Sequence, residues 1–300
     1  MSEGRAQWRG PCLATSRGHW IVRKLKRRRQ HDWPTEALKH VPHIMPIRSL
    51  LFKIYWALEK VLVPDLQYAH SLYEQVLMSH VAGDTEWLDV GCGHQILPQW
   101  RAEPERQLVE TCQSIVGIDA SAGSLSKHRT IKARVAGNIG RLPFRDDSFS
   151  LVTANMAVEH LDTPGTQFVE IARVLKPGGI FIMHTPNRRG YTTIAARLIP
   201  DLIKKKLVYL LQRREPDDVF ETYYRANTRG EIATLAGGAG FRIRQIKLIV
   251  SAAELVVLPP LVVFELIWIR LLMTRLLKPF RTNIIAVLQK ADPVSAAVRS

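Results

Sequence analysis

The chain has 300 residues, 46% of them hydrophobic, which is enough for a sizeable core in one or two domains. The formal net charge is +15, and the first 30 positions hold nine Arg or Lys residues against a single acid. More than half of the excess therefore lies in an N-terminal arm. The three cysteines, Cys12, Cys92 and Cys112, have neither metal-ligand spacing nor an even count. This argues against a disulfide framework or a metal site and indicates a reducing, cytoplasmic compartment.

Residues 1–45 show no apolar periodicity and no apolar stretch of the kind found in secretory signals, so we expect a disordered basic arm. Its run of cations at residues 23–29 could contact nucleic acid or anionic lipid. A solvated tail, coding sequence read upstream of a start at Met45, and an Arg-rich organelle transit peptide are the alternatives.

Two amphipathic helices are predicted within residues 46–82. Apolar residues recur at helical spacing from Ile47 to Val63, and Pro64 ends the pattern. This helix packs on the core or, being basic, lies on a membrane surface. A second helix is expected from Tyr68 to His80.

Strands and helices alternate in residues 83–290, which we expect to form one domain, and residues 291–300 are expected to form a tail. Such alternation predicts an α/β fold with a doubly wound, mostly parallel sheet covered on both faces. We expect strands at Glu86–Val90, Ile115–Ile118, Ala133–Ala136, Leu151–Ala154, Gly179–His184, Gly240–Val250 and Asn283–Gln289, with helices near Pro104–Gln113, Leu125 and Thr166–Leu175.

A glycine turn follows the first of these strands. Gly91 and Gly93 can adopt positive φ and let the backbone approach a small molecule, while Asp89 closes the strand at the edge where open sheets bind ligands. Such a turn also occurs in phosphate loops, in dinucleotide sites and in plain tight turns.

Four later segments accompany the turn, at residues 115–121, 137–149, 151–160 and 174–187. Together with residues 87–95, their order and spacing resemble the motif series of class I S-adenosylmethionine-dependent methyltransferases that act on small molecules and lipids. The resemblance covers residues 80–290. It implies a Rossmann-like, seven-stranded sheet with an antiparallel last strand, and S-adenosylmethionine as cofactor.

The resemblance also assigns cofactor residues. Asp89, Gly91 and Gly93 would serve the methionine end and Asp119 the ribose, with Cys92 and Ala120 as further cofactor-binding residues. Asn138 and Ile139 fall where the family places an acid and an apolar residue against adenine; the Asn carbonyl can still accept from the adenine amino group. Asn155 would line the pocket floor.

The loop departs from the family pattern in two places. Gln95 replaces the third glycine, so the following helix is expected to start later or pack less closely. The long gap before Asp119 leaves residues 98–104 as an expected surface insertion.

A nicotinamide dehydrogenase is the competing enzyme class. Its fingerprint needs a third glycine where Ile96 stands and an acid about 20 residues further on, whereas Asp119 lies 26 residues after Gly93. The segments at 138–144 and 176–179 also have no counterpart in that class.

Methyl transfer from a sulfonium is an in-line displacement that depends mainly on positioning, with a general base needed only for a protonated acceptor. His160 and His184, each at the end of a strand, are the candidate bases, or else structural histidines. Tyr223, Tyr224 and Arg225 lie in an insertion, residues 190–228, where such enzymes often build the acceptor pocket. They could equally form an ordinary packed loop.

A late apolar stretch, residues 255–277 within an insertion at 252–281, is about long enough to span a bilayer. Its charges argue against a lipid-exposed span, and Pro259 and Pro260 are expected to interrupt the helix. We therefore expect an interfacial helix or hydrophobic lid. Residues 198–214 have a similar basic amphipathic character. Both could contact a membrane peripherally, on its inner face, or form a homodimer interface or added core.

The sequence thus predicts methyl transfer to a small apolar or lipid-linked acceptor, on oxygen, such as an isoprenoid quinone precursor or a lipid-linked sugar. A nucleic-acid methyltransferase using the basic arm is less favoured, because the chain lacks the Asn/Asp-Pro-Pro-Tyr/Phe motif. A non-catalytic scaffold that binds S-adenosylmethionine is the other alternative.

Overall fold

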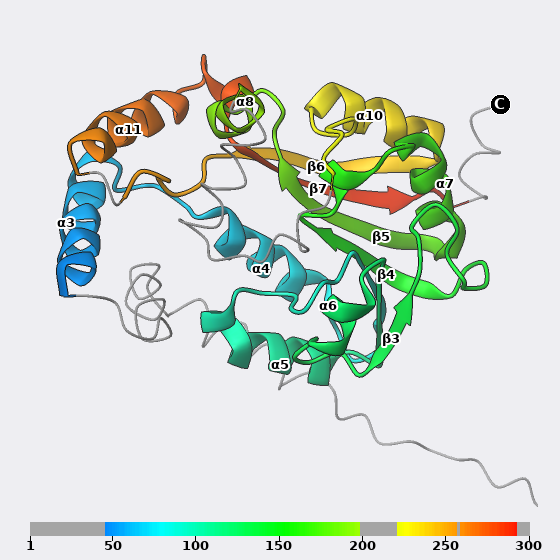
Figure 1. Ribbon diagram of the computed structural model, residues 1–300. Coiled ribbons are helices and arrows are strands. Elements are labelled where there is room, and N and C mark those ends of the chain that lie inside the picture. Colours follow the sequence, from blue (N-terminus) through cyan, green and yellow to red (C-terminus); the bar gives the residue numbers. More distant parts are fainter. Residues whose placement is uncertain (1–45, 199–220, 257–258, 293–300) are drawn as a thin grey trace, which may run out of the picture.

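The computed structural model describes residues 46–198, 221–256 and 259–292 (Figure 1). The basic arm at 1–45, almost all of the amphipathic segment 198–214 and most of the C-terminal tail lie outside these ranges. What the sequence predicts for them stays a prediction.

Seven strands form one mixed sheet in the order β3-β2-β1-β4-β5-β7-β6 (Figure 1). All neighbouring pairs are parallel except those of β7, which is antiparallel to both β5 and β6. The predicted α/β fold, with its antiparallel last strand, is confirmed. The strands are β1 (Glu86–Val90), β2 (Ser114–Asp119), β3 (Ala133–Ala136), β4 (Phe149–Asn155), β5 (Leu175–Pro186), β6 (Phe241–Ile249) and β7 (Asn283–Lys290).

Helices cover both faces of the sheet because alternate strand residues point to opposite sides. On β1, Leu88 packs into one apolar cluster and Trp87 into the other. Helices α7 (Pro164–Val174) and α10 (Arg229–Gly238) contribute to the first cluster. Helices α4 (Ala69–His80), α5 (Ala102–Thr111) and the short α6 (Ala122–Ser126) contribute to the second.

The segment between the glycine turn and α5 differs from the surface insertion that the sequence predicts. A 3-10 turn (Gln99–Arg101) leads into α5, and Arg101 is buried in an ion pair with Glu74 of α4. Ile96 and Leu97 are also buried. The segment is therefore a packed bridge between the turn and α4. In agreement with the lost third glycine, the helix after the turn starts only at Ala102.

Helices α3 (Pro46–Leu62) and α11 (Pro259–Leu272) pack on each other beside the sheet rather than on its faces (Figure 1). Their shared interior is a third apolar cluster. The prediction that Pro259 and Pro260 interrupt a helix is wrong. Instead, α11 begins at Pro259, since proline fits the first helical turn, where its missing N–H is not needed. Within the described residues, no helix is long and apolar enough to cross a membrane.

Candidate functional site

The turn after β1 is held open by its two glycines. Gly91 has φ +66° and Gly93 φ +53°, the left-handed region that favours glycine. A Cβ on Gly91 would come within 2.5 Å of the Ala157 Cβ, whereas one on Gly93 would meet nothing within 4 Å. Gly91 thus allows close packing on the segment after β4, while Gly93 leaves room on the ligand side of the turn.

Asp119, at the carboxyl end of β2, ties the turn to the neighbouring strand. One carboxylate oxygen accepts from the backbone N–H of Gly93 at 2.9 Å and the other from that of Ser121 at 2.8 Å. Each oxygen has a second lone pair, so the side chain can still accept from two hydroxyls of a ligand. Ala120, the next residue, is exposed.

Asp89 lies behind the turn and is buried. Its Oδ1 accepts from Thr153 Oγ1 at 2.5 Å, and that hydroxyl oxygen accepts from the Trp87 indole N–H at 2.7 Å. Burial raises the pKa of Asp89 to about 7, although the hydrogen bond from Thr153 opposes the shift. A ligand cation beside this carboxyl would favour its charged form.

The segment at 137–139 lies next to Asp119, because the Gly137 N–H donates to the Asp119 carbonyl at 3.0 Å. The Asn138 side-chain carbonyl accepts from the Gly140 N–H at 2.7 Å and keeps one lone pair for a ligand. Ile139 is half-buried against the sheet. Cys92 is buried, with burial raising its thiol pKa, so it supports the turn as an apolar side chain.

Asn155, at the end of β4, bridges the turn segment to His184. Its Nδ2 donates to the Ile96 carbonyl at 3.1 Å, so its Oδ1 accepts from His184 Nδ1 at 2.9 Å. This fixes the proton of the imidazole on Nδ1 and leaves Nε2 as an acceptor. His184 Nε2 is buried without a hydrogen-bond partner among the described residues, and burial lowers the pKa of His184 to about 4.

The second candidate histidine occupies a different setting. His160 Nδ1 donates to the Glu221 carbonyl at 2.7 Å, and the ring is half-buried. The backbone N–H groups of Tyr223 and Tyr224 both donate to the Glu159 carbonyl, and Arg225 donates to the Asp162 carbonyl at 2.6 Å. The structure therefore brings His160 together with Tyr223, Tyr224 and Arg225, and it places His184 apart from them, facing α4.

These features have counterparts in known proteins. Residues 88–183 match the sequence profile of the family described as "Methyltransferase domain". The chain contains a class I methyltransferase domain.

Several curated relatives share this domain. An uncharacterized methyltransferase of Schizosaccharomyces pombe is 32% identical over 114 residues, covering 34% of this chain and 40% of that protein. A probable S-adenosylmethionine-dependent methyltransferase of Mycolicibacterium smegmatis is 31% identical over 122 residues, 40% of this chain and 44% of that protein. A demethylmenaquinone methyltransferase of Lactiplantibacillus plantarum is 29% identical over 120 residues, 37% of this chain and 49% of that protein. The chain thus matches less than half the length of each of these relatives.

Among solved structures, a methyltransferase from Mesorhizobium loti aligns with 74% of this chain and 98% of its own, at 16% identity and a TM-score of 0.48.

The methyltransferase domain also contains site residues that the sequence did not reveal. Tyr73 of α4 is fully buried, with its ring centroid 5.6 Å from that of His184. Its hydroxyl lies in the field of Asp89 but makes no hydrogen bond of normal geometry within the described residues. Its sequence setting is that of an ordinary core residue beside Leu72 and Leu77, so no local signal marks it.

A second unpredicted group is a set of buried, hydrogen-bonded polar side chains behind the loop at 221–227. Thr185 Oγ1 donates to Glu159 Oε2 at 3.0 Å and accepts from Asn227 Nδ2 at 2.7 Å. Burial raises the pKa of Glu159. These hydrogen bonds fix the loop at 221–227 to the ends of β4 and β5. Only the Glu-His pair at 159–160 could have drawn attention to it.

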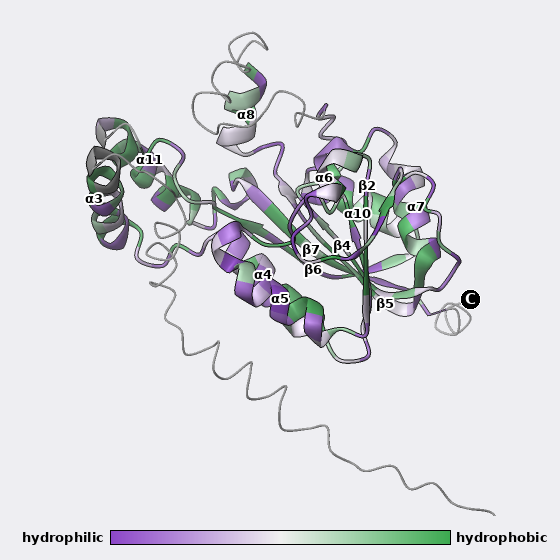
Figure 2. Ribbon diagram, turned by 60° about the horizontal axis from the view of Figure 1, so that its bottom comes forward, coloured by the Kyte–Doolittle hydropathy of each residue, from purple (hydrophilic) through white to green (hydrophobic). Residues whose placement is uncertain are grey.

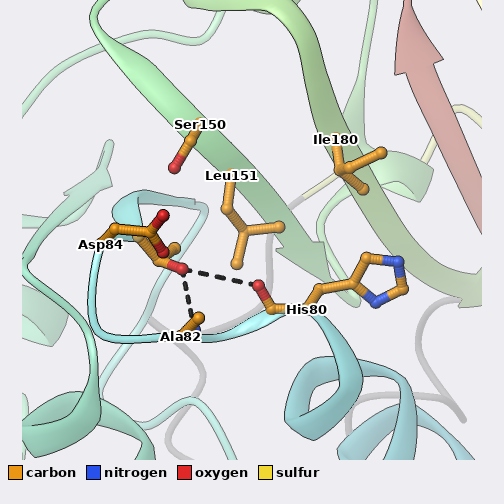
Figure 3. A pocket seen from close by; sticks show the side chains of 7 residues that line it. His80, Ala82, Asp84, Ser150, Leu151 and Ile180 are labelled. Carbon is orange, nitrogen blue, oxygen red and sulfur yellow. Dashed lines mark hydrogen bonds between the residues drawn. The ribbon is translucent and has the colours of Figure 1, made fainter. Parts of the chain in front are cut away.

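The opposite edge of the sheet carries a hollow of about 210 Å³ (Figure 3). It is lined by His80, Ala82, Asp84, Thr85, Ser150, Leu151 and Ile180. It lies at the start of β1 and β4, away from the glycine turn, so we do not assign it to the cofactor. Within the described ranges, no three His, Cys, Asp or Glu side chains are grouped to hold a metal ion.

Proposed function

We propose that the protein transfers the methyl group of S-adenosylmethionine to a small apolar or lipid-linked acceptor, with oxygen as the target atom. The observation that carries this proposal is the open Gly93 turn tied to Asp119 at the carboxyl edge of a class I methyltransferase sheet.

The chain offers a set of groups that fit this donor. Asp89 and the Gly93 turn would hold the cationic methionine end, and the free lone pairs of Asp119 would accept from the ribose hydroxyls. Asn138 and Ile139 would meet the adenine. When bound, the donor supplies an electrophilic methyl group on a sulfonium.

His184 is the better placed of the two candidate bases. It is neutral at physiological pH because burial keeps its pKa near 4, and its Nε2 is the ring atom able to take a proton. A base of such low pKa contributes mainly by orienting an acceptor hydroxyl, so positioning would supply most of the acceleration. His160, Tyr223, Tyr224 and Arg225 would then contact the acceptor from the other side.

The acceptor class is supported by two independent features. The relatives include demethylmenaquinone methyltransferases and a malonyl-[acyl-carrier protein] O-methyltransferase, which is 31% identical over 119 residues. The second feature is the exposed apolar surface of α11, which includes Phe264, Ile267 and Leu271.

The proposal is tested by incubating the full chain with methyl-labelled donor and, separately, membrane and soluble extracts, followed by intact-mass analysis. We expect a labelled product from the membrane extract that is lost with Asp119→Ala and kept with Glu110→Ala, an exposed acid on α5. Label in nucleic acid would instead support the alternative enzyme class. Label in no fraction would support a non-catalytic scaffold.

A further inference from the structure

Helices α3 and α11 form a small unit with its own interior. Val262, Leu266 and Ile269 of α11 are fully buried, as is Tyr55 of α3. They belong to one apolar cluster that is separate from the two clusters on the sheet. The apolar inner faces of both helices are therefore buried against each other.

Both helices are rich in hydrophobic residues (Figure 2), and several of these side chains are exposed. On α3, Leu50, Ile54 and Val61 follow one helical stripe, with Leu50 58% and Val61 78% exposed. On α11 and the segment after it, Phe264 is 71% and Leu276 85% exposed. The other exposed apolar side chains of this part are Leu261, Ile267, Trp268, Leu271 and Phe280. A helix that is apolar all round needs a second apolar environment.

Acidic groups of the unit are turned inward. Glu59 accepts from the Tyr55 hydroxyl and, at 2.6 Å, from that of Tyr68. Glu265 is buried and accepts from the Tyr191 hydroxyl at 2.7 Å and from the backbone N–H groups of Glu254 and Leu255. Neither carboxylate adds to the charge of the exposed surface.

Basic groups, in contrast, are exposed. They are Lys53 and Lys60 on α3, Arg270 on α11, and Arg275 and Lys278 after it. Of the exposed acids nearby, Asp65 lies 4.0 Å from Arg270, and the backbone N–H of Glu254 donates to the buried Glu265. The exposed surface of the unit, here called its outer face, thus combines large apolar side chains with an excess of cations, which can extend towards water and headgroups.

We propose that this outer face docks on an anionic lipid bilayer, with Phe264 and Leu276 inserted among the acyl chains and the lysines at headgroup level. A second copy of the chain fits less well, because a two-fold interface would press two like-charged faces together. A bilayer with anionic headgroups matches both the apolar side chains and the cations of this face.

The α3–α11 unit is attached to the sheet close to the proposed donor site. The chain from β6 to β7, which contains α11, leaves and re-enters the sheet at Ile249 and Asn283. Asn283 pairs with both Ile249 and Pro186, the last residue of β5. The unit is therefore attached at the same edge of the sheet as the glycine turn. Docking would bring that edge towards the bilayer; this last step, unlike the docking itself, rests on the proposed function.

The test is flotation of the full chain, without donor, on phosphatidylcholine vesicles and on mixed phosphatidylcholine and phosphatidylglycerol vesicles. We expect flotation with the mixed vesicles, weakening with salt. Phe264→Gln combined with Leu276→Gln keeps every charge, including the basic arm, and should lower partitioning at least tenfold. The matched control is Val169→Gln, a 52% exposed apolar side chain on α7, which should change nothing.

Two further variants test the cations of the outer face. Lys53→Gln should weaken partitioning about fivefold, and Lys60→Gln by the same factor, the value for ~1 kcal/mol per cation near an anionic surface. Thermal melting and donor binding show whether each variant is folded. Equal flotation of the Phe264 and Leu276 variant and the wild type would overturn the proposal, as would no flotation of the wild type. A wild-type dimer that the apolar variant converts to monomer, with no lipid binding, would assign the face to a second copy.

Discussion

The carboxyl edge of the sheet and the α3–α11 unit differ in where they place their polar and apolar side chains. At the sheet edge, polar side chains are buried or half-buried and hydrogen-bonded to backbone, as Asp119 is to Gly93 and Asn155 to Ile96. In the α3–α11 unit, large apolar side chains such as Phe264 are left on the outside. The first pattern preorganises a small polar ligand site, and the second favours an apolar environment. Each can therefore be damaged while the other is spared.

The largest expected loss of stability comes from Glu265→Ala. The change leaves the Tyr191 hydroxyl and two backbone N–H groups without their acceptor, at about 1–3 kcal/mol each when buried. We expect the α3–α11 unit to loosen while the sheet edge keeps its donor affinity. Hydrogen exchange of α11, read beside donor calorimetry, checks this. Equal loss in both regions would show that the two are not separable.

The next effect contrasts the two glycines of the turn. Gly91→Ala forces both a positive φ and a 2.5 Å clash with Ala157, and should destabilise the protein by about 2–4 kcal/mol. Gly93→Ala carries only the φ cost of about 1–2 kcal/mol, yet should abolish donor binding because its Cβ would extend into the open space beside the turn, where we propose that the donor binds. Denaturant unfolding and calorimetry separate the two. If Gly93→Ala binds the donor normally, the turn does not hold it.

Replacing each of the two histidines distinguishes their proposed roles at the carboxyl edge of the sheet. His184→Ala should lower kcat about a hundredfold if its Nε2 orients the acceptor. His160→Ala removes one bond to the loop at Glu221 and should mainly raise KM. Because burial holds the pKa of His184 near 4, activity that depends on its neutral form should not fall between pH 8 and about 5. A loss of kcat within that range would contradict this role of His184.

A further effect concerns the pH dependence of stability. The pKa of Asp89 is about 7 in the folded protein, against 3.8 for an aspartate side chain surrounded by water, so the folded state binds more protons between these values. Stability should therefore be greatest below about pH 4 for this group and fall by up to about 1.4 kcal/mol per pH unit as pH rises towards 7.

Asp89→Asn should flatten that slope. Melting curves at several pH values measure it, with Glu110→Gln on the exposed face of α5 as the control. An unchanged slope in Asp89→Asn would contradict the buried setting of this carboxyl.

The sequence predicts those parts of the molecule that local patterns determine. The apolar runs correctly predict the ends of β1 and β3, and Gly91, Gly93 and Asp119 stand at the sheet edge as the family motif implies. Contacts between distant residues were not predictable. Arg101 lies in the segment that the sequence predicts as a surface insertion. It is buried instead, because it pairs with Glu74 of α4, which lies 27 positions away in the sequence.

The same limit explains the missed site residues. Tyr73 and His184 meet only because α4 packs on a face of the sheet, and Thr185 and Asn227, which share a hydrogen bond, lie 42 positions apart. The start of α11 at Pro259 is predictable from the local sequence, since proline is favoured in the first turn of a helix. The prediction of an interrupted helix rests on the effect of proline inside a helix, which does not apply at its first residues.

The proposed donor site is best tested by calorimetry of S-adenosylmethionine binding to the folded full chain, compared with Asp119→Ala. We expect binding by the wild type and at least a tenfold weaker affinity in the variant, because the ribose acceptor and the anchor of Gly93 are lost together. No heat with the wild type, or equal affinity in the variant, would contradict it.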